Sequence, residues 1–496
     1  MDRRNFLFAA AGTLAFGAHA SEVPDAYAAA FEASRASQPW TLGYAGLQQD
    51  AAPMPLKLRG KIPSALYGAY FRNGPARHEI GGQRYHHLFD GDGMVQKYTI
   101  GPDGVSHMGR FVRTQKFLAD SAAGRPVRAA FGTHPPGAEP MHSPDAINAA
   151  NTSVLQHGGE FYALWEGGSA TRMDPRTLDT GELKTWSPEY AGMPFSAHPK
   201  VEPDGTLWNF GVSSMAGLLS VYRIDARGAL QNAVTLKVPE MSLVHDFAVT
   251  QKYLVFLLPP LVFDRARSEA GETFLDSHVW KPQLGMRVLV LDKDKLEEPQ
   301  WFTLPAGFVF HIGNACEDRG VIRLDYVRSD DAWHATTGLK ELMQGKAQTR
   351  TDVSVVVVQL DLASGRARQE LLPHVSEFPR VDPRVVGRRY SQVLLAERVD
   401  ARAGRPGFDS VLRLDVTSGK ADRYRYGADV MVEEHVFVPG TRAGEAWVIG
   451  TALDLKHRSM LLSVFDARRL ADGPVAQAVM DRPMPLGFHG ILVPNT

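Results

Sequence analysis

Four of the seventeen histidines lie in segments that otherwise have the composition of apolar strands or strand edges. They are His198, His245, His311 and His489. Imidazole is the commonest protein ligand of iron, copper and zinc, so four such rings brought to one point would bind a transition metal. A single histidine in an apolar strand is more often a core residue hydrogen-bonded to the backbone, and spacing alone leaves that alternative open.

Thiolate ligands are scarce in this chain. The chain has one cysteine, Cys316, which cannot form an internal disulfide or by itself hold zinc or an iron–sulfur cluster. Any metal must therefore be held by histidines and carboxylates. Four further histidines lie in polar or turn-like surroundings, and we expect them to be solvated: His78, His157, His374 and His457.

Composition excludes several classes of protein. The 496 residues are 44% apolar, and 54 basic residues stand against 55 acidic ones. A chain of this length and apolar content can bury a large core, which excludes low-complexity disorder. Because affinity for a polyanion comes mainly from clustered Lys and Arg, the balanced charge argues against a nucleic-acid binder.

One short unit recurs along the chain: a β-rich run that ends in Asp, followed by a turn with Gly or Pro. The copies end at Asp174, Asp225, Asp292, Asp361, Asp415 and Asp466. Asp suits the first position of a turn because its side chain can accept a hydrogen bond from the backbone two residues on. The copies recur about every 50 to 70 residues, the length of a four-stranded blade with long loops, and so predict a β-propeller.

Six copies and a first blade near residues 94–112 predict seven blades. The expected fold is all-β, with long loops and a few short helices covering one face, near residues 24–37 and 330–344. No interdomain linker is visible, so residues 21–496 are expected to form one domain. A large β-sandwich or a pair of β-domains remains the alternative. A propeller brings the inner strands of all its blades to one axis, where distant histidines could meet.

Residues 1–20 have the pattern of an export signal. Arg3 and Arg4 precede an apolar run over residues 8–16 and a small-x-small ending at 18–20. The paired arginines make this segment similar to a bacterial twin-arginine signal, so we expect an exported protein of the periplasm or cell envelope. A frayed N-terminus is the alternative. No later stretch reaches the roughly 18 uninterrupted apolar residues of a membrane-spanning helix.

A series of short motifs resembles the carotenoid cleavage oxygenase family. The match runs in the family's order from about residue 55 to residue 494. Its blocks are residues 70–75, 87–94, 151–153, 163–168, 196–200, 244–247, 311–315, 377–380, 434–439 and 487–490. One block alone would be unspecific, whereas the whole series is highly specific.

The resemblance implies a seven-bladed propeller with one non-haem Fe(II) on its axis. The matching positions make His198, His245, His311 and His489 the ligands. Three glutamates would hydrogen-bond to them: Glu166 to His245, Glu377 to His311 and Glu434 to His489. Such carboxylates would offset the ion's charge and fix the orientation of the rings. Glu433, at a position where the family often has Gly, is expected to be solvated.

The implied reaction is oxidative cleavage of a carbon–carbon double bond by O₂, giving two carbonyl fragments, with no side chain needed as a general base. Stilbene-cleaving members carry Lys directly before the first of these glutamates and Tyr in an upstream loop. Here Trp165 precedes Glu166, and the loop over residues 131–135 has no Tyr. Trp suits stacking on a polyene and cannot replace the charge of Lys, so we expect a carotenoid or apocarotenoid. The substrate contacts are predicted to be Trp165, Phe310, Phe488 and His134.

Three alternatives stay open from the sequence. They are a stilbene dioxygenase, a non-catalytic propeller that binds an apolar ligand, and an isomerase or hydrolase on the same scaffold. Peripheral membrane contact is also considered, because residues 254–263 and Phe131 could form an exposed apolar rim. For most of that run, however, a simple blade strand is the favoured interpretation.

Overall fold

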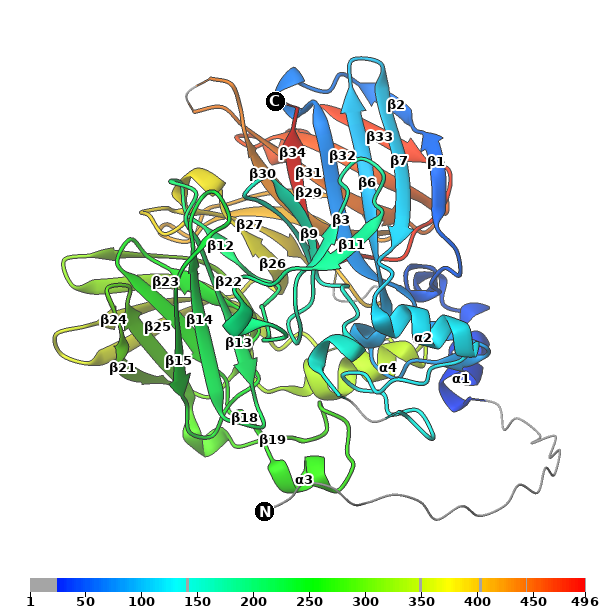
Figure 1. Cartoon of the computed structure of the whole chain (residues 1–496). Coiled ribbons are helices and arrows are strands. Elements are labelled where there is room, and N and C mark those ends of the chain that lie inside the picture. The colour runs from blue at the N-terminus through cyan, green and yellow to red at the C-terminus, as the bar shows by residue number, and fades with distance from the viewer. Residues whose placement is uncertain (1–24, 140–141, 348–349, 401–403, 443, 496) are drawn as a thin grey trace, which may run out of the picture.

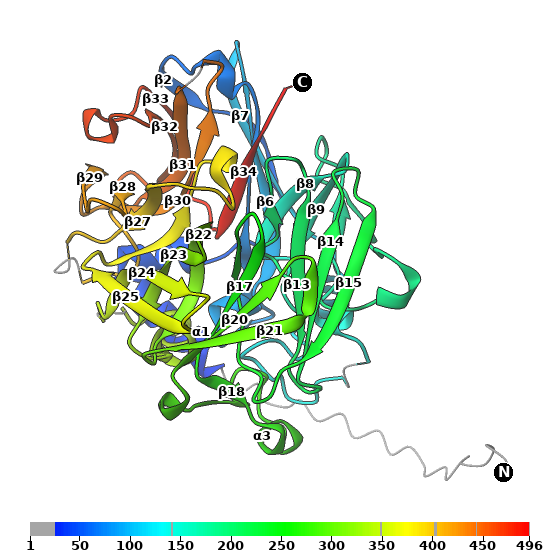
Figure 2. The ribbon, with the colours of Figure 1, turned by 90° about the vertical axis from the view of Figure 1, so that its left-hand side faces the viewer.

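The computed structural model of the chain describes residues 25–139, 142–347, 350–400, 404–442 and 444–495. Seven antiparallel sheets of four or five strands stand around a common centre (Figures 1 and 2). The predicted seven-bladed β-propeller is therefore confirmed. The predicted export signal, residues 1–20, lies outside the described residues.

Blades 1 to 3 are built mostly from the first half of the chain. From the innermost strand outward, blade 1 contains β34 (His489–Pro494), β3 (Gly68–Arg77), β6 (Asp92–Gly101), β7 (Gly104–Phe111) and β1 (Ala51–Pro55). Blade 2 contains β8 (Ser153–His157), β9 (Glu160–Leu164), β10 (Thr171–Met173) and β11 (Thr180–Leu183). Blade 3 contains β12 (Lys200–Val201), β13 (Leu207–Ser213), β14 (Leu218–Ile224) and β15 (Leu230–Lys237).

The remaining blades follow in chain order. Blade 4 contains β16 (Phe247–Val249), β17 (Tyr253–Leu258), β20 (Met286–Asp292) and β21 (Lys295–Leu304). Blade 5 contains β22 (Phe308–Asp318), β23 (Val321–Ser329), β24 (Val353–Asp361) and β25 (Arg366–Leu372). Blade 6 contains β26 (Ser376–Arg380), β27 (Gln392–Glu397), β28 (Ser410–Asp415) and β29 (Ala421–Arg425). Blade 7 contains β30 (Val430–Pro439), β31 (Ala446–Asp454), β32 (Ser459–Asp466), β33 (Ala476–Met480) and β2 (Lys57–Gly60).

The two ends of the chain interlock to close the ring. The C-terminal strand β34 pairs with β3, so that His489 lies opposite Asn73. In the other direction, the early strand β2 pairs with β33 at the outer edge of blade 7. Blades 1 and 7 are therefore each built from both ends of the chain, which fixes the position of the last inner strand.

The recurring Asp residues stand at equivalent places in six blades, where the third strand turns into the fourth. In every copy the carboxylate accepts a hydrogen bond from the backbone N–H two residues on, as the sequence predicted. The donors are Arg176, Arg227, Asp294, Ala363, Thr417 and Arg468, at 2.7–3.1 Å.

Helices are short and gather toward the lower end of the molecule in Figure 1. The α-helices are α1 (Ala26–Arg35), α2 (Gln115–Ala123), α3 (Arg265–Glu269) and α4 (Leu339–Met343), and a π-helix, η7 (His334–Gly338), precedes α4. The 3₁₀ turns are η1 (Pro39–Tyr44), η2 (Ser64–Leu66), η3 (Leu88–Asp90), η4 (Pro144–Ile147), η5 (Pro188–Tyr190), η6 (Pro282–Leu284), η8 (Pro383–Val385) and η10 (Leu470–Asp472). Two short ribbons, β4 (Glu79–Ile80) with β5 (Gln83–Arg84) and β18 (Leu261–Phe263) with β19 (His278–Trp280), complete the elements of the described residues.

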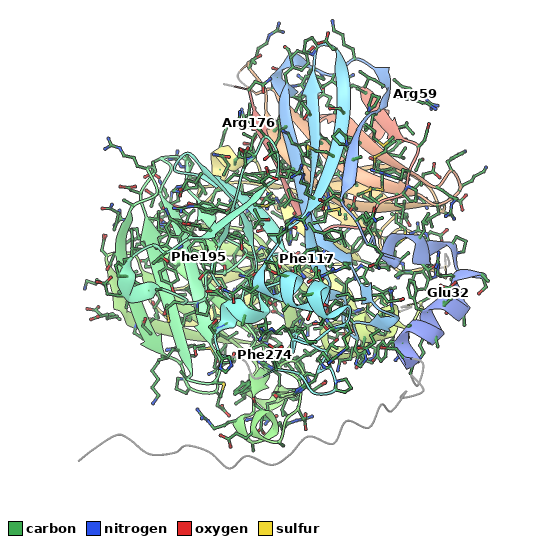
Figure 3. The ribbon with its side chains drawn as sticks, turned by 45° about the vertical axis from the view of Figure 1, so that its right-hand side comes forward. Glu32, Arg59, Phe117, Arg176, Phe195 and Phe274 are labelled. Carbon is green, nitrogen blue, oxygen red and sulfur yellow. The ribbon has the colours of Figure 1, made fainter. Side chains whose placement is uncertain are left out.

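Helix α2 was not expected from the sequence. Its inward side carries Lys116 and Asp120, both fully buried, beside Phe117, which Figure 3 labels. Charged residues on the inner side of a helix hide the apolar stripe that normally reveals it. The helices near residues 24–37 and 330–344 are confirmed by α1 and by η7 with α4.

The run over residues 254–263 is not an exposed rim. Leu254, Val255 and Phe256 on β17 are 0% exposed because both faces of this inner strand pack against neighbouring blades. Phe131 is also buried, against Leu261 and Phe308. The rim hypothesis is wrong for these residues, and the blade-strand interpretation is confirmed. No helix among the described residues is long and apolar enough to cross a membrane.

Candidate metal centre

Each of the seven blades contributes one polar residue to the centre of the ring. The four histidines come from the inner edges of blades 3, 4, 5 and 1. His198 and His245 lie just before β12 and β16, His311 lies in β22, and His489 begins β34. Blades 2, 6 and 7 contribute the three predicted glutamates: Glu166 after β9, Glu377 in β26 and Glu434 in β30.

The four rings converge on one point. The ligand atoms of the four histidines all lie within 4.8 Å of one another. The Nε2 atoms of His198 and His245 are 2.9 Å apart, and those of His311 and His489 are 3.1 Å apart. With metal–nitrogen bonds of about 2.1 Å, two ligands at right angles on one ion are about 3 Å apart. The spacing fits a single transition-metal ion.

Carboxylates fix the tautomer of three of the rings. The Nδ1–H of His245 donates to Glu166 at 2.6 Å, that of His311 to Glu377 at 2.5 Å, and that of His489 to Glu434 at 2.8 Å. With the proton held on Nδ1, the Nε2 atom of each ring presents a lone pair to the centre.

The Nε2 atoms of His311 and His489 are 3.1 Å apart. Both present a lone pair, so both are hydrogen-bond acceptors. Two acceptors at this distance repel unless a cation lies between them. Nitrogen donors alone suit iron, copper or zinc and not magnesium or calcium. The donor set therefore fits a bound transition metal.

Burial favours the neutral form of His198 and His489. At His245 burial also opposes the charged form, but Glu166 outweighs it and the pKa of this ring is raised. Burial and the neighbouring rings of His245, His489 and His311 hold the pKa of His198 well below its usual value. Burial also lowers the pKa of His489 to about 4, although Glu434 opposes that shift. Neutral imidazoles can bind a metal near neutral pH without first losing a proton.

Glu434 remains ionised in spite of its surroundings. Burial by itself would raise the pKa of this carboxyl, but Arg380, His489 and Arg72 outweigh it and lower the pKa to about 2. Its second oxygen accepts the backbone N–H of Gly490 at 2.8 Å. A permanent negative charge thus lies behind the fourth histidine.

Glu433 is not solvated, which corrects the sequence interpretation. Its side chain is 2% exposed and forms an ion pair with Arg72 at 3.2 Å. The register of β30 against β31 shifts between Val432 and His435, so the strict in–out alternation of a strand is interrupted there. Both Glu433 and Glu434 can consequently be buried, and Arg72 supplies the charge that Glu433 needs.

The other histidines expected to be solvated divide into three cases. His78 and His157 are buried, 1% and 7% exposed, so the expectation is wrong for both. His374 is half-buried and pairs with Glu397 at 2.8 Å. His457 is exposed and is confirmed as a surface residue. Local polarity failed because loops and turns pack against these side chains. Gly46 and Gly91 lie against His78, and His157 is 2.9 Å from the carbonyl oxygen of Gly205.

A largely apolar cavity of about 820 Å³ opens beside the histidines. It extends from Met215 and Phe274, near blades 3 and 4, past His245 and His311, to Phe408 and Met431 in blades 6 and 7. Phe274 lies in the lower part of the molecule, where Figure 3 labels it. The lining residues of this cavity therefore come from several blades around the four-histidine cluster.

All four predicted substrate contacts line this cavity: Trp165, Phe310, Phe488 and His134. Phe89 lies between the rings of Phe310 and Phe488, with ring centres 5.7 and 5.4 Å away. The aromatic lining surrounds the cluster with apolar surface.

The position of Trp165 depends on the glycine two residues later. A Cβ atom on Gly167 would lie 2.6 Å from the indole ring. Asp145 holds the same loop by accepting hydrogen bonds from the backbone N–H and the hydroxyl of Ser169, at 2.7 and 2.9 Å. The loop fixes Trp165 and Glu166 together.

Phe378 is a neighbour of the cluster that sequence reasoning missed. Its backbone has φ of 57°, an unusual value for a bulky residue, and its ring centre lies 5.5 Å from those of His311 and His489. The available signal was its position directly after Glu377, within the motif block 377–380.

Comparison with known proteins identifies the family. The model of a family described as retinal pigment epithelial membrane protein matches residues 45–494. The chain belongs to this family. The resemblance to carotenoid cleavage oxygenases is therefore confirmed, as is one Fe(II) per chain held at a buried four-histidine site.

Curated relatives match over most of their length. The chain is 30% identical to apocarotenoid-15,15'-oxygenase of Synechocystis over 92% of this chain and 96% of the relative. It is 27% identical to lignostilbene-alpha,beta-dioxygenase isozyme III of Sphingomonas paucimobilis, over 88% and 92%. It is 25% identical to an isoeugenol monooxygenase of Pseudomonas nitroreducens, over 89% and 94%.

Solved structures agree with the fold. Cobalt-substituted Synechocystis apocarotenoid oxygenase superposes with a TM-score of 0.82 and 26% identity, over 92% of this chain and 98% of that chain. A variant of the same oxygenase superposes equally well. The enzyme class predicted from the motifs, a dioxygenase of the carotenoid-cleaving type, is thus confirmed.

Proposed function

We propose that this protein is a non-haem Fe(II) dioxygenase that cleaves one double bond of a carotenoid or apocarotenoid with O₂, giving aldehyde or ketone products. One observation carries the proposal: four imidazoles converge on one point, and three of them, His245, His311 and His489, line a largely apolar cavity of about 820 Å³. A long polyene can lie in such a cavity with an internal double bond beside the histidines.

The roles of the residues follow from their positions. His198, His245, His311 and His489 would hold the iron, which when bound supplies the site at which O₂ is activated. Glu166, Glu377 and Glu434 orient three of the rings and offset the charge of the ion. The aromatic lining, including Phe310 and Phe488, excludes water and aligns the alkene.

Two features of the cavity favour a polyene over a phenolic stilbene. Among the described residues, no lysine lines it, so no ammonium group there could bind a phenolate. Trp165 occupies the position directly before Glu166 and offers a flat apolar surface. Stilbenes remain the alternative substrate class on the same scaffold.

The test is product analysis with purified, iron-loaded protein. A panel of carotenoids, apocarotenals and stilbenes is incubated under ¹⁸O₂, and the products are identified by mass spectrometry. We expect two carbonyl fragments from a carotenoid or apocarotenal, with label from the gas. Cleavage of stilbenes alone would select the alternative substrate. An unlabelled isomer or hydrolysis product, or ligand binding without turnover, would reject the dioxygenase.

We further propose that the protein works outside the cytoplasm and contacts a membrane surface at the cavity mouth. Met215 and Phe274 line the mouth and are 49% and 40% exposed, which is unusual for large apolar side chains. Cell fractionation tests the export. Sedimentation with lipid vesicles tests the contact, and we expect Phe274→Ser to reduce binding several-fold while Leu371→Ser, on the outer strand β25, leaves it unchanged.

A further inference from the structure

A buried ion pair closes the seam between blades 7 and 1. Arg72 on β3 and Glu433 on β30 are 3.2 Å apart, with side chains 1% and 2% exposed. Neither residue is one of the proposed metal ligands, and the proposed reaction assigns them no step. Their position behind His489 nevertheless connects them to the four-histidine cluster.

The pair holds the chain segment that carries His489. The carboxylate of Glu433 accepts the backbone N–H of Gly487 at 2.5 Å, two residues before the histidine. The guanidinium of Arg72 donates to the carbonyl oxygen of Phe488 at 3.1 Å, one residue before it. The two opposite charges therefore hydrogen-bond to backbone groups of two consecutive residues, Gly487 and Phe488.

The same pair also holds the strand that carries Glu434. Arg72 donates to the carbonyl oxygen of Glu434 at 3.0 Å, and Thr451 donates its hydroxyl to Glu433 at 2.5 Å. Because Glu434 is the carboxylate that accepts the Nδ1–H of His489, donor and acceptor of that hydrogen bond are positioned by one ion pair.

Stability alone is a weak reason for such a pair. Desolvation of two buried charges offsets much of their attraction, and well-packed apolar residues of similar size are often as stable. Moreover, the Nε of Arg72 has no hydrogen-bond partner among the described residues, so the pair is not even fully satisfied. Its hydrogen bonds instead converge on backbone atoms next to the fourth histidine.

We infer that Arg72 and Glu433 are positioning residues. They raise the metal affinity of the centre by holding His489 and Glu434 at hydrogen-bonding distance from each other. The inference rests on the proposed metal ligation. Residues that orient ligands typically change metal affinity by 10–100-fold when replaced. Since the pair acts through His489, we expect the lower part of that range.

The experiment titrates Co²⁺ into metal-free, full-length protein and follows both affinity and the visible absorption of the bound ion. Thermal stability of the metal-free protein is measured in parallel. Glu433→Gln keeps the shape and removes the charge, Arg72→Met removes the cation, and the double variant removes both. We expect each single variant to lower Co²⁺ affinity about ten-fold and to shift the absorption bands.

The double variant separates positioning from stability. Without an unpaired charge it should recover most of the lost thermal stability. Its Co²⁺ affinity should stay low, because the hydrogen bonds to Gly487 and Phe488 are weakened or gone. A recovery of affinity together with stability would overturn the inference, as would unchanged affinity and spectrum in Glu433→Gln.

Two further variants complete the design. Arg77 lies on the same strand as Arg72 and pairs with Asp92 at 2.7 Å, away from the histidines. Arg77→Met should lose stability without changing Co²⁺ affinity, and an equal loss of affinity there would also overturn the inference. If Glu433→Gln does not fold, Thr451→Val removes one donor to Glu433, and we expect a measurable affinity loss, smaller than the roughly ten-fold loss expected when the ion pair is broken. If the wild type binds no Co²⁺, the proposed function itself fails.

Discussion

This propeller buries two clusters of polar side chains, and the clusters differ in whether all their charges and hydrogen-bonding atoms have partners. Beneath α2, Lys116 contacts Asp92 at 2.9 Å and Asp120 at 3.2 Å, and Arg77 completes a set of two positive and two negative charges. Every charge there has a partner of opposite sign. The charges of these four residues, which we call the Lys116 network, are therefore balanced without a further ion. The network holds α2 on blade 1.

In the four-histidine centre, by contrast, some hydrogen-bonding atoms have no suitable partner. Its carboxylates are satisfied on the outside by ring N–H groups, whereas the ring nitrogens on the inside face one another. Burial and charge are common to both regions, so neither identifies a functional site. The functional site is identified instead by several hydrogen-bond acceptors that converge on one point without a donor.

The largest effect should come from removing a ligand. His245→Ala takes away one of four nitrogens and leaves Glu166 without its partner. We expect metal affinity to fall by more than about 100-fold, with loss of cleavage activity. Iron content of the purified variant is the measurement, and circular dichroism checks that the fold is kept. Full iron content would contradict the assignment of this ligand.

The Lys116 network should respond in the opposite way. Lys116→Met leaves two buried carboxylates with Arg77 alone, so the free energy of unfolding should fall by about 3–5 kcal/mol. Chemical denaturation of the metal-free protein measures this loss. Metal affinity of the folded variant should equal that of the wild type. A comparable loss of metal would show that the two regions are not independent.

Glu434→Gln should have an intermediate effect, lowering metal affinity by about 10–100-fold through His489. It also changes acid stability. The folded-state pKa of Glu434 is about 2, below the usual 4.5, so this carboxyl stabilises the fold above about pH 4.5 and that contribution disappears as pH falls toward 2. Denaturation of the metal-free protein between pH 5 and 2 should show a shallower decline in the variant. An identical decline would exclude Glu434 as a cause.

The smallest effect concerns the cavity wall. A methyl group on Gly167 would lie 2.6 Å from the indole of Trp165 and push the ring into the cavity. For Gly167→Ala we expect iron content to be unchanged and KM to rise several-fold, with a smaller change in kcat. Steady-state kinetics with one apocarotenal measures both. Loss of iron without a change in KM would mean that the loop acts on Glu166 instead.

Much of this organisation could be predicted from the sequence. The Asp-ended strands repeat because every blade needs the same turn, and Asp174 and its counterparts all make the expected hydrogen bond. The four histidines and three glutamates were visible as motif positions. Their convergence follows from a propeller because its inner strands share one axis.

What escaped prediction depends on contacts between distant strands. Glu433 is predicted from the sequence to be the solvated neighbour of Glu434, but the register of β30 is interrupted there and both are buried, which cannot be read from the sequence. Its partner Arg72 is 361 residues away. His78 and His157 are polar by neighbourhood in sequence but are covered by other segments.

The central claim is that four imidazoles, and no other side chains, hold one iron on the propeller axis. X-ray absorption at the iron edge of the loaded full-length protein, together with its metal content, tests this most directly. We predict one iron per chain with a scattering pattern of four imidazole rings. Fewer rings, a thiolate or carboxylate among the protein ligands, or protein that takes up no iron would contradict the account.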